Sequence, residues 1–154
     1  MVCGVGFADL SGFTALTQQL QPDELSMLLS EFNATVTDVV HADGGRVVKF
    51  IGDAVMWVSP TAASLAQAAA DLVRHPKAVQ AGLQVRAGIA YGSMIAINGD
   101  YFGVPVNLAA RLVAAAEPGQ ILAAQSVHDV LPDWPGRALD PVALKGFDEP
   151  QPVY

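Results

Sequence analysis

The chain has 154 residues, of which 52% are apolar and 15% are charged, and its formal net charge is −7. This length suits a single domain, residues 1–154, with one real core, and the high apolar share excludes an intrinsically disordered chain. The negative charge and the lack of a basic run argue against a nucleic acid polymer as partner, and no apolar run reaches the roughly 20 residues of a membrane span. One cysteine, Cys3, permits no internal disulfide. With no signal-peptide pattern at the start, we expect a cytoplasmic protein or a domain of a larger one.

Apolar spacing predicts short strands and helices along the first half of the chain. Ser11-Gly12 breaks the first strand, Pro22 suits the first turn of a long helix, and Gly44-Gly45 ends that helix. Gly52-Asp53 is typical of a two-residue hairpin turn. The predicted elements are a strand at Val2–Asp9, helices at Phe13–Gln19 and Pro22–Ala42, strands at Arg46–Ile51 and Ala54–Val58, and an alanine-rich helix at Ala62–Val73.

The second half predicts shorter elements and a small β-rich tail. They are strands at Gln84–Ala90 and Ser93–Ile97 around Tyr91-Gly92, a helix at Pro105–Ala116, a strand at Ile121–Ala123, a helix at Ser126–Leu131, and short strands near Ala138, at Val142–Leu144 and at Val153–Tyr154. The order β-α-α-β-β-α-β-β-α predicts an α/β (α+β) fold, with a ferredoxin-like sheet whose helices pack mainly on one face.

Two aspartates fall where strands end. Asp9 closes the first strand, and Asp53 lies in the predicted hairpin turn. Each alone has an ordinary interpretation, as a helix cap or a turn residue. If the first strand lies beside the hairpin, however, both carboxylates meet at one edge and repel each other unless a cation lies between them. Mg²⁺ is typically held by one or two carboxylates together with substrate phosphates, and a pair of ions can activate an attacking oxygen and stabilise a leaving one.

The segment Ser11-Gly12-Phe13-Thr14 lies between Asp9 and the next predicted helix. Free backbone N–H groups at a helix start, with a glycine that allows close approach, suit a phosphate group. The first strand and this segment therefore form one candidate site for a metal and a phosphate.

A second group of polar residues lies in GDYFGVPVNLAARL, residues 99–112. Asn107 and Arg111 are four apart on a predicted helix, so they share one face. There they could hold a sugar oxygen and a phosphoryl charge, or they could simply form a solvated polar stripe. Asp100 could likewise be an ordinary loop acid beside Gly99.

Four motifs in order resemble the catalytic domain of class III nucleotidyl cyclases of the bacterial or mycobacterial adenylyl cyclase type. They are FADLSGFT, KFIGDAVM, VNLAARL and LKGFDEP, and the similarity extends from Phe7 to Tyr154. The resemblance implies the palm-type sheet of these enzymes. It also implies that Asp9, Asp53 and the carbonyl of Leu10 bind two Mg²⁺ or Mn²⁺ ions in each active site, and that Gly12, Phe13 and Thr14 form the triphosphate loop.

The resemblance also implies roles for the remaining candidates. Lys49 and Asp100 match the pair that reads adenine, Asn107 the residue that orients the ribose, and Arg111 the residue that stabilises the transition state. Lys145 and Arg86 match residues that contact the phosphates. Two departures stand out: Tyr-Phe-Gly follows Asp100 where many members have a hydrophobic residue and Trp-Gly, and GIAYG lacks a histidine often found there.

Members of this family work as head-to-tail dimers with the active sites at the subunit interface. The resemblance therefore implies a homodimeric adenylyl cyclase that converts ATP to 3′,5′-cyclic AMP and pyrophosphate. Lys49 and Asp53, four apart on one hairpin, would then serve two different active sites. Lys49 offers a donor and Asp100 an acceptor, which complements N1 and N6 of adenine and meets guanine poorly, so we expect ATP to be preferred over GTP.

Other functions remain open at this point. One is a guanylyl cyclase, and another is a catalytically silent homologue that binds nucleotide or dimerises. A diguanylate cyclase is a third, but its GG[DE]EF-type signature is absent from the sequence. A purely structural module would leave the aspartates and the Asn107/Arg111 pair without a common explanation.

Overall fold

A computed structural model describes residues 1–76, 83–134, 139–142, 144 and 151–153. The elements in chain order are β1 (Val2–Ser11), α1 (Phe13–Gln19), α2 (Pro22–Ala42), β2 (Arg46–Ile51), β3 (Ala54–Ser59), α3 (Ala62–Val73), β4 (Gln84–Ser93), β5 (Ile95–Ile97), β6 (Asp100–Phe102), α5 (Val104–Ala115), β7 (Ile121–Ala123), α6 (Gln125–Val130), β8 (Leu139–Val142) and β9 (Gln151–Val153). No helix in these ranges is long and apolar enough to cross a membrane.

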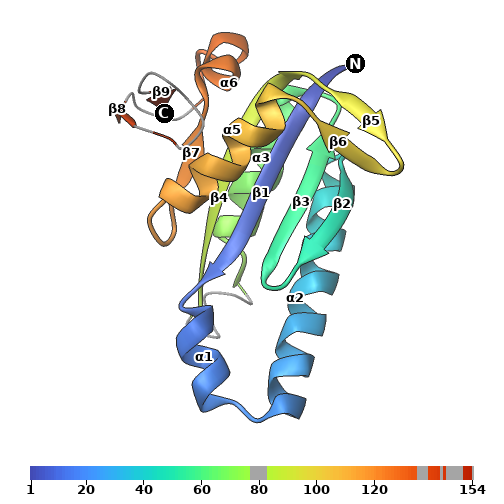
Figure 1. Ribbon diagram of the computed structural model, residues 1–154, viewed down its shortest axis with the longest axis vertical. Helices are drawn as coiled ribbons and strands as arrows, with labels where there is room; N and C mark the ends of the chain where they lie inside the picture. The colour runs from blue at the N-terminus through green and yellow to red at the C-terminus, as the bar shows by residue number, and fades with distance from the viewer. Residues whose placement is uncertain (77–82, 135–138, 143, 145–150, 154) are drawn as a thin grey trace.

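A five-stranded sheet forms the centre of the domain, with the strand order β2-β3-β1-β4-β7 (Figure 1). All neighbouring strands are antiparallel except β4 and β7, which run parallel. Two small ribbons stand apart from this sheet: β5 pairs with β6, and β8 pairs with β9. The central position of β1 places the residues at its carboxyl end between the β2–β3 hairpin and β4.

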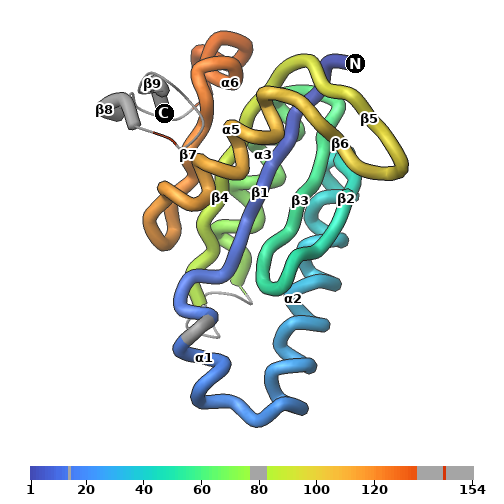
Figure 2. The backbone as a smooth tube through the Cα atoms, in the orientation of Figure 1, coloured from blue at the N-terminus to red at the C-terminus, as the bar shows by residue number. Residues whose placement is uncertain are grey.

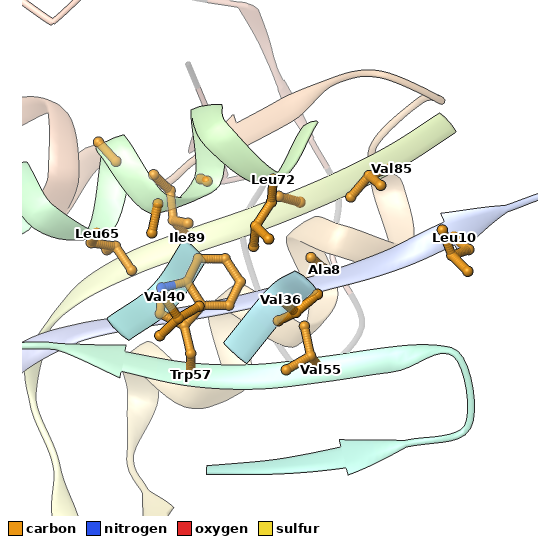
Figure 3. Close-up of a cluster of buried hydrophobic side chains, with 14 of the residues drawn as sticks. Ala8, Leu10, Val36, Val40, Val55, Trp57, Leu65, Leu72, Val85 and Ile89 are labelled. Carbon is orange, nitrogen blue, oxygen red and sulfur yellow. The ribbon is translucent and has the colours of Figure 1, made fainter. Parts of the chain in front are cut away.

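Helices α2, α3 and α6 pack on one face of the sheet. Their apolar residues share a core with alternate residues of the strands, among them Val55 and Trp57 of β3 (Figure 3). The indole of Trp57 is fully buried, and it lies so close to Gly6 that a side chain on Gly6 would overlap the ring. The predicted α/β class, with helices mainly on one face, is thereby confirmed.

Helix α5 covers part of the opposite face, above β1 and β4. Its residues Ala109 and Leu112 share a second core with Val5 of β1 and Met56 of β3. The helix approaches β4 closely because Gly88 faces it: a Cβ there would lie 2.4 Å from the backbone nitrogen of Val113. A glycine at this position therefore fixes how near α5 lies to the sheet.

The chain begins and ends its helices where the local signals predict. Gln21 and Glu24 form a reciprocal capping box at the start of α2, with Pro22 in the first turn, and the Thr61 side chain accepts a hydrogen bond from the Ser64 amide at the start of α3. Such caps satisfy amides that have no partner within the helix. Gly44, with φ of 84°, follows α2 in the left-handed conformation that glycine adopts readily.

The structure corrects the prediction around Tyr91-Gly92. Strand β4 does not break there but continues to Ser93, because β1 pairs with it through Gly92 and Ser93. The predicted strand Ser93–Ile97 is only the short β5, and β6 was not predicted. In the tail, β8 shares only Val142 with the predicted strand Val142–Leu144, and β9 shares only Val153 with the predicted strand Val153–Tyr154. Ala138, near which a further strand was predicted, falls outside the described residues.

Candidate active site

The structure brings Asp9 and Asp53 together at one end of the sheet. Asp9 pairs with Ala54 in the β1–β3 register, so Asp53 in the preceding turn lies beside it. The tube trace in Figure 2 shows this turn next to the carboxyl end of β1. Both aspartates line a surface pocket of about 430 Å³. Its other lining residues are Leu10, Ser11, Gly12, Phe13, Arg86 and Pro118.

The alternative interpretation of Asp9 as a helix cap is wrong. The N-cap of α1 is Gly12, with φ of 80°, and no side chain in the described part of the chain caps the helix. A Cβ on Gly12 would meet nothing within 4 Å, so the backbone there borders open space. Phe13 packs its ring against the core. These features fit the predicted phosphate loop; the side chain of Thr14, also assigned to it, lies outside the described part of the chain.

Arg86 makes the strongest contacts in this pocket. Its Nε donates to one carboxylate oxygen of Asp9 at 2.7 Å and an Nη donates to the other at 3.2 Å. The other Nη donates to the carbonyl oxygens of Ala114 and Ala116, both at 3.2 Å. The hydrogen bond to Asp9 raises the pKa of Arg86 further. Arg86 was predicted to contact phosphate; its pairing with Asp9 was not predicted and follows from the direct cross-strand register of the two residues.

Asp53 lies in an environment that disfavours its negative charge. Burial raises the pKa of Asp53 and the charge of Asp9 adds to the rise, whereas backbone hydrogen bonds, including one from Leu10, and the charge of Arg86 oppose it. A cation between the two carboxylates would remove this penalty. The described residues contain no cluster of three or more His, Cys, Asp or Glu side chains that could hold a metal ion, and the two carboxylates in this pocket offer oxygen donors only. That oxygen-only set suits Mg²⁺ or Mn²⁺.

The side chains of Lys49 and Asp100 contact each other, and neither residue lines the Asp9 pocket. The Lys49 ammonium lies 2.7 Å from a carboxylate oxygen of Asp100. The other oxygen of Asp100 accepts from the Tyr101 amide at 2.8 Å. The hydrogen bond from Lys49 holds the pKa of Asp100 below its ordinary value. The interpretation of Asp100 as an isolated loop acid is therefore wrong, since it belongs to a strand and to an ion pair.

Asn107 and Arg111 lie together on the exposed side of α5. Among the described residues, neither side chain takes part in a hydrogen bond or an ion pair. The structure thus does not join them to Asp9, Asp53 or the Lys49–Asp100 pair within one chain. The role of the Leu10 carbonyl stays a prediction, and Lys145 falls outside the described residues.

Comparisons with known proteins agree on one family. The family model described as "Adenylate and Guanylate cyclase catalytic domain" matches residues 2–154. The uncharacterized protein Rv2212 of Mycobacterium tuberculosis is 69% identical over 150 residues, which cover 97% of this chain and 40% of that protein. An adenylate cyclase of Streptomyces coelicolor is 42% identical over 118 residues, covering 77% of this chain and 31% of its own length. The chain therefore spans well under half of these relatives.

Among solved structures, the adenylyl cyclase CyaB from P. aeruginosa matches with a TM-score of 0.89 and 27% identity. The match covers 99% of this chain and 92% of the other. The likeness extends over the central sheet and the helices on both of its faces.

Proposed function

The chain belongs to the family of adenylate and guanylate cyclase catalytic domains, and on that premise we propose that it is an adenylyl cyclase. It would convert ATP to 3′,5′-cyclic AMP and pyrophosphate at two sites shared across a homodimer. The 3′-oxygen of the ribose forms a bond to the α-phosphorus, and the bond from that phosphorus to pyrophosphate breaks. A cytoplasmic location fits this proposal, since ATP is supplied there.

The choice of ATP rests on one observation, the Lys49–Asp100 pair. Its 2.7 Å contact holds a donor and an acceptor side by side, the two kinds of group with which N1 and N6 of adenine would pair. Guanine presents the opposite polarity at the corresponding atoms, so it would leave polar groups unpaired, which a binding site rejects strongly. Adenylate cyclases among the relatives support the same choice.

Asp9 and Asp53 would hold Mg²⁺ or Mn²⁺, two ions per site, with help from the Leu10 carbonyl. When bound, such ions lower the pKa of the 3′-hydroxyl and offset charge on the triphosphate. The Gly12–Thr14 backbone would receive the phosphates. Arg86 would release one or both of its hydrogen bonds to Asp9 and turn its guanidinium toward the triphosphate, as would Lys145 from the tail.

Asn107 would orient the ribose so that its 3′-oxygen lies in line with the bond that breaks, an effect of orientation. Arg111 would offset the charge that develops on the α-phosphoryl group. Because both side chains are exposed without a partner among the described residues, a second copy of the chain would supply the Asp9 pocket that they face in the active dimer. This supports active sites built from both subunits.

The direct test is product formation from radiolabelled ATP or GTP with Mg²⁺ or Mn²⁺, with Asp53→Ala as the inactive control. Cyclic AMP from the wild type, at a higher kcat/KM than cyclic GMP, is the expected result. Faster turnover of GTP would replace this proposal by a guanylyl cyclase. Nucleotide binding without any cyclic product, in the homodimer, would identify a silent homologue instead.

A further inference from the structure

The β5–β6 ribbon carries Asp100 but, within the described residues, has no backbone pairing with the main sheet. In the described part of the chain, two side-chain contacts link β6 to β2: Lys49 with Asp100, and Arg46 with Tyr101. We propose that Arg46 and Tyr101 are positioning residues that hold Asp100 against Lys49, and that this clamp sets the preference for adenine over guanine. The inference rests on the proposed function and deepens it, because neither residue was assigned a role.

A β-bulge in β2 makes the arrangement possible. Residues three apart on a regular strand point to opposite faces of a sheet. Here Arg46 pairs with Val58 and Lys49 with Met56, with a register shift between Val47 and Lys49. The extra residue in the bulge returns Lys49 to the face of Arg46, so both cations point toward β6.

Tyr101 is anchored from two sides. Its side chain is buried, 9% exposed, in the core that also contains Met56 and Val58. An Nη of Arg46 donates to its hydroxyl oxygen at 2.6 Å, and the guanidinium carbon lies 5.6 Å from the ring centroid, within the range of a cation–π contact. The backbone of Tyr101 is therefore fixed relative to β2.

This fixed backbone in turn orients the neighbouring carboxylate. The Tyr101 amide donates to one oxygen of Asp100 at 2.8 Å, which leaves the other oxygen for Lys49 at 2.7 Å. Moving Tyr101 moves the amide that holds Asp100, and the donor and acceptor of the pair lose their relative placement. Discrimination between two bases depends on that placement, whereas neither Lys49 nor Asp100 lines the Asp9 pocket that would hold metal and phosphate.

The test uses Tyr101→Phe, which keeps the buried ring and removes only the hydroxyl, and Arg46→Met, which keeps an unbranched side chain and removes the guanidinium. Steady-state kinetics with ATP and GTP would be joined by equilibrium binding of non-hydrolysable ATP and GTP analogues. Tyr91→Phe is a matched control, since Tyr91 packs against the core on the other face of the sheet.

For each clamp variant we expect the ratio of ATP to GTP kcat/KM to fall about 10-fold, the scale of one hydrogen bond to a charged group. The fall should appear in KM and in analogue binding more than in kcat. Because the two residues act on one contact, the double variant should lose no more selectivity than either single variant. Tyr91→Phe should keep the wild-type ratio.

Unchanged selectivity in Tyr101→Phe and Arg46→Met, with both folded by circular dichroism, would overturn the inference while leaving the cyclase proposal intact. Losses that add in the double variant would also overturn it, since they would indicate two independent effects. A wild type that binds ATP selectively, but forms no cyclic product, would refute the proposed activity; loss of that selective binding in the variants would still support the clamp. Equal binding of ATP and GTP by the wild type would overturn the clamp outright.

Discussion

Mixing two inactive variants tests directly whether each active site draws on both subunits. Asp53→Ala removes a carboxylate from the Asp9 pocket, and Asn107→Ala removes the amide on the exposed side of α5. If Asp53 and Asn107 of one chain serve different sites, each variant alone forms dimers in which both sites are broken. We expect each to lose about 10²-fold or more in kcat.

The size of the recovery follows from two-fold symmetry. In a mixed dimer, one site carries both substitutions and the other carries neither. With free exchange in an equal mixture, about half of the dimers are mixed and each has one intact site of two, so activity should return to about one quarter of wild type. When the two variants are mixed nine to one, the same reasoning gives about a tenth of wild-type activity, because the fraction of mixed dimers is proportional to the product of the two mole fractions.

The assay is cyclic AMP formation after the two chains, carrying different affinity tags, have been incubated together. Co-purification of both tags demonstrates subunit exchange. A matched control mixes Asp53→Ala with Asp9→Ala: both substitutions damage the same half of a site, so no intact site forms and no recovery is expected. Proven exchange without recovery in the Asp53/Asn107 mixture would refute the sharing of sites.

Four further predictions concern single features of the fold and site. Lys49→Glu combined with Asp100→Gly should lower the ATP to GTP ratio of kcat/KM by about 10² or more, because the donor and acceptor pattern no longer fits adenine; an unchanged ratio would contradict the role of the pair. Arg86→Met removes the guanidinium that lies beside the carboxylates of Asp9 and Asp53. We expect the free energy of unfolding to fall by about 1–3 kcal/mol, since the pair is only partly exposed, and Mg²⁺ to raise the melting temperature more than in wild type. Gly88→Ala should destabilise by about 1–3 kcal/mol in urea titration, because its Cβ would lie 2.4 Å from the backbone of α5. Burial, together with a hydrogen bond to Asp71 and the negative charge of Asp71, raises the pKa of Asp43 from 3.8 to about 6, so the folded protein binds this proton more tightly than the unfolded chain does. Ionisation then costs stability increasingly as the pH rises from 3.8 to about 6, and Asp43→Asn should stabilise by about 1–2 kcal/mol at pH 7 and by nothing at pH 3.

Local signals predicted the bounds of α1, α2, β2, α3 and β7 to the residue, and those of β1, β3, α5 and α6 to within one or two residues. Pro22 at the start and Gly44-Gly45 at the end bracket α2 with its predicted bounds, and the Gly52-Asp53 turn joins β2 to β3 as expected. The adjacency of Asp9 and Asp53 was predicted from the hairpin and is confirmed by the β1–β3 register. The chemical roles of these residues stay predictions.

Two other contacts between distant segments, Arg86 with Asp9 and Arg46 with Tyr101, were not predicted. Arg86 meets Asp9 only because β4 lies on the other side of β1 from β3, and strand order depends on packing of the whole sheet. Strand β6, Asp-Tyr-Phe, begins with a charged residue and lacks the continuous apolar run that revealed the equally short β7, Ile-Leu-Ala. The Arg46–Tyr101 contact joins residues 55 positions apart, and the bulge that permits it has no clear sequence signal.

The buried position of Trp57, in close contact with Gly6, allows the folding of each variant to be checked by fluorescence. The indole is fully buried and its Nε1 has no hydrogen-bond acceptor among the described residues, so its fluorescence should be shifted to short wavelength in the native protein and move to longer wavelength on unfolding. With Trp134 replaced by Phe, emission would report this single ring. A variant that loses turnover but keeps the native emission has a catalytic defect, whereas a variant with red-shifted emission has lost the packing of its core.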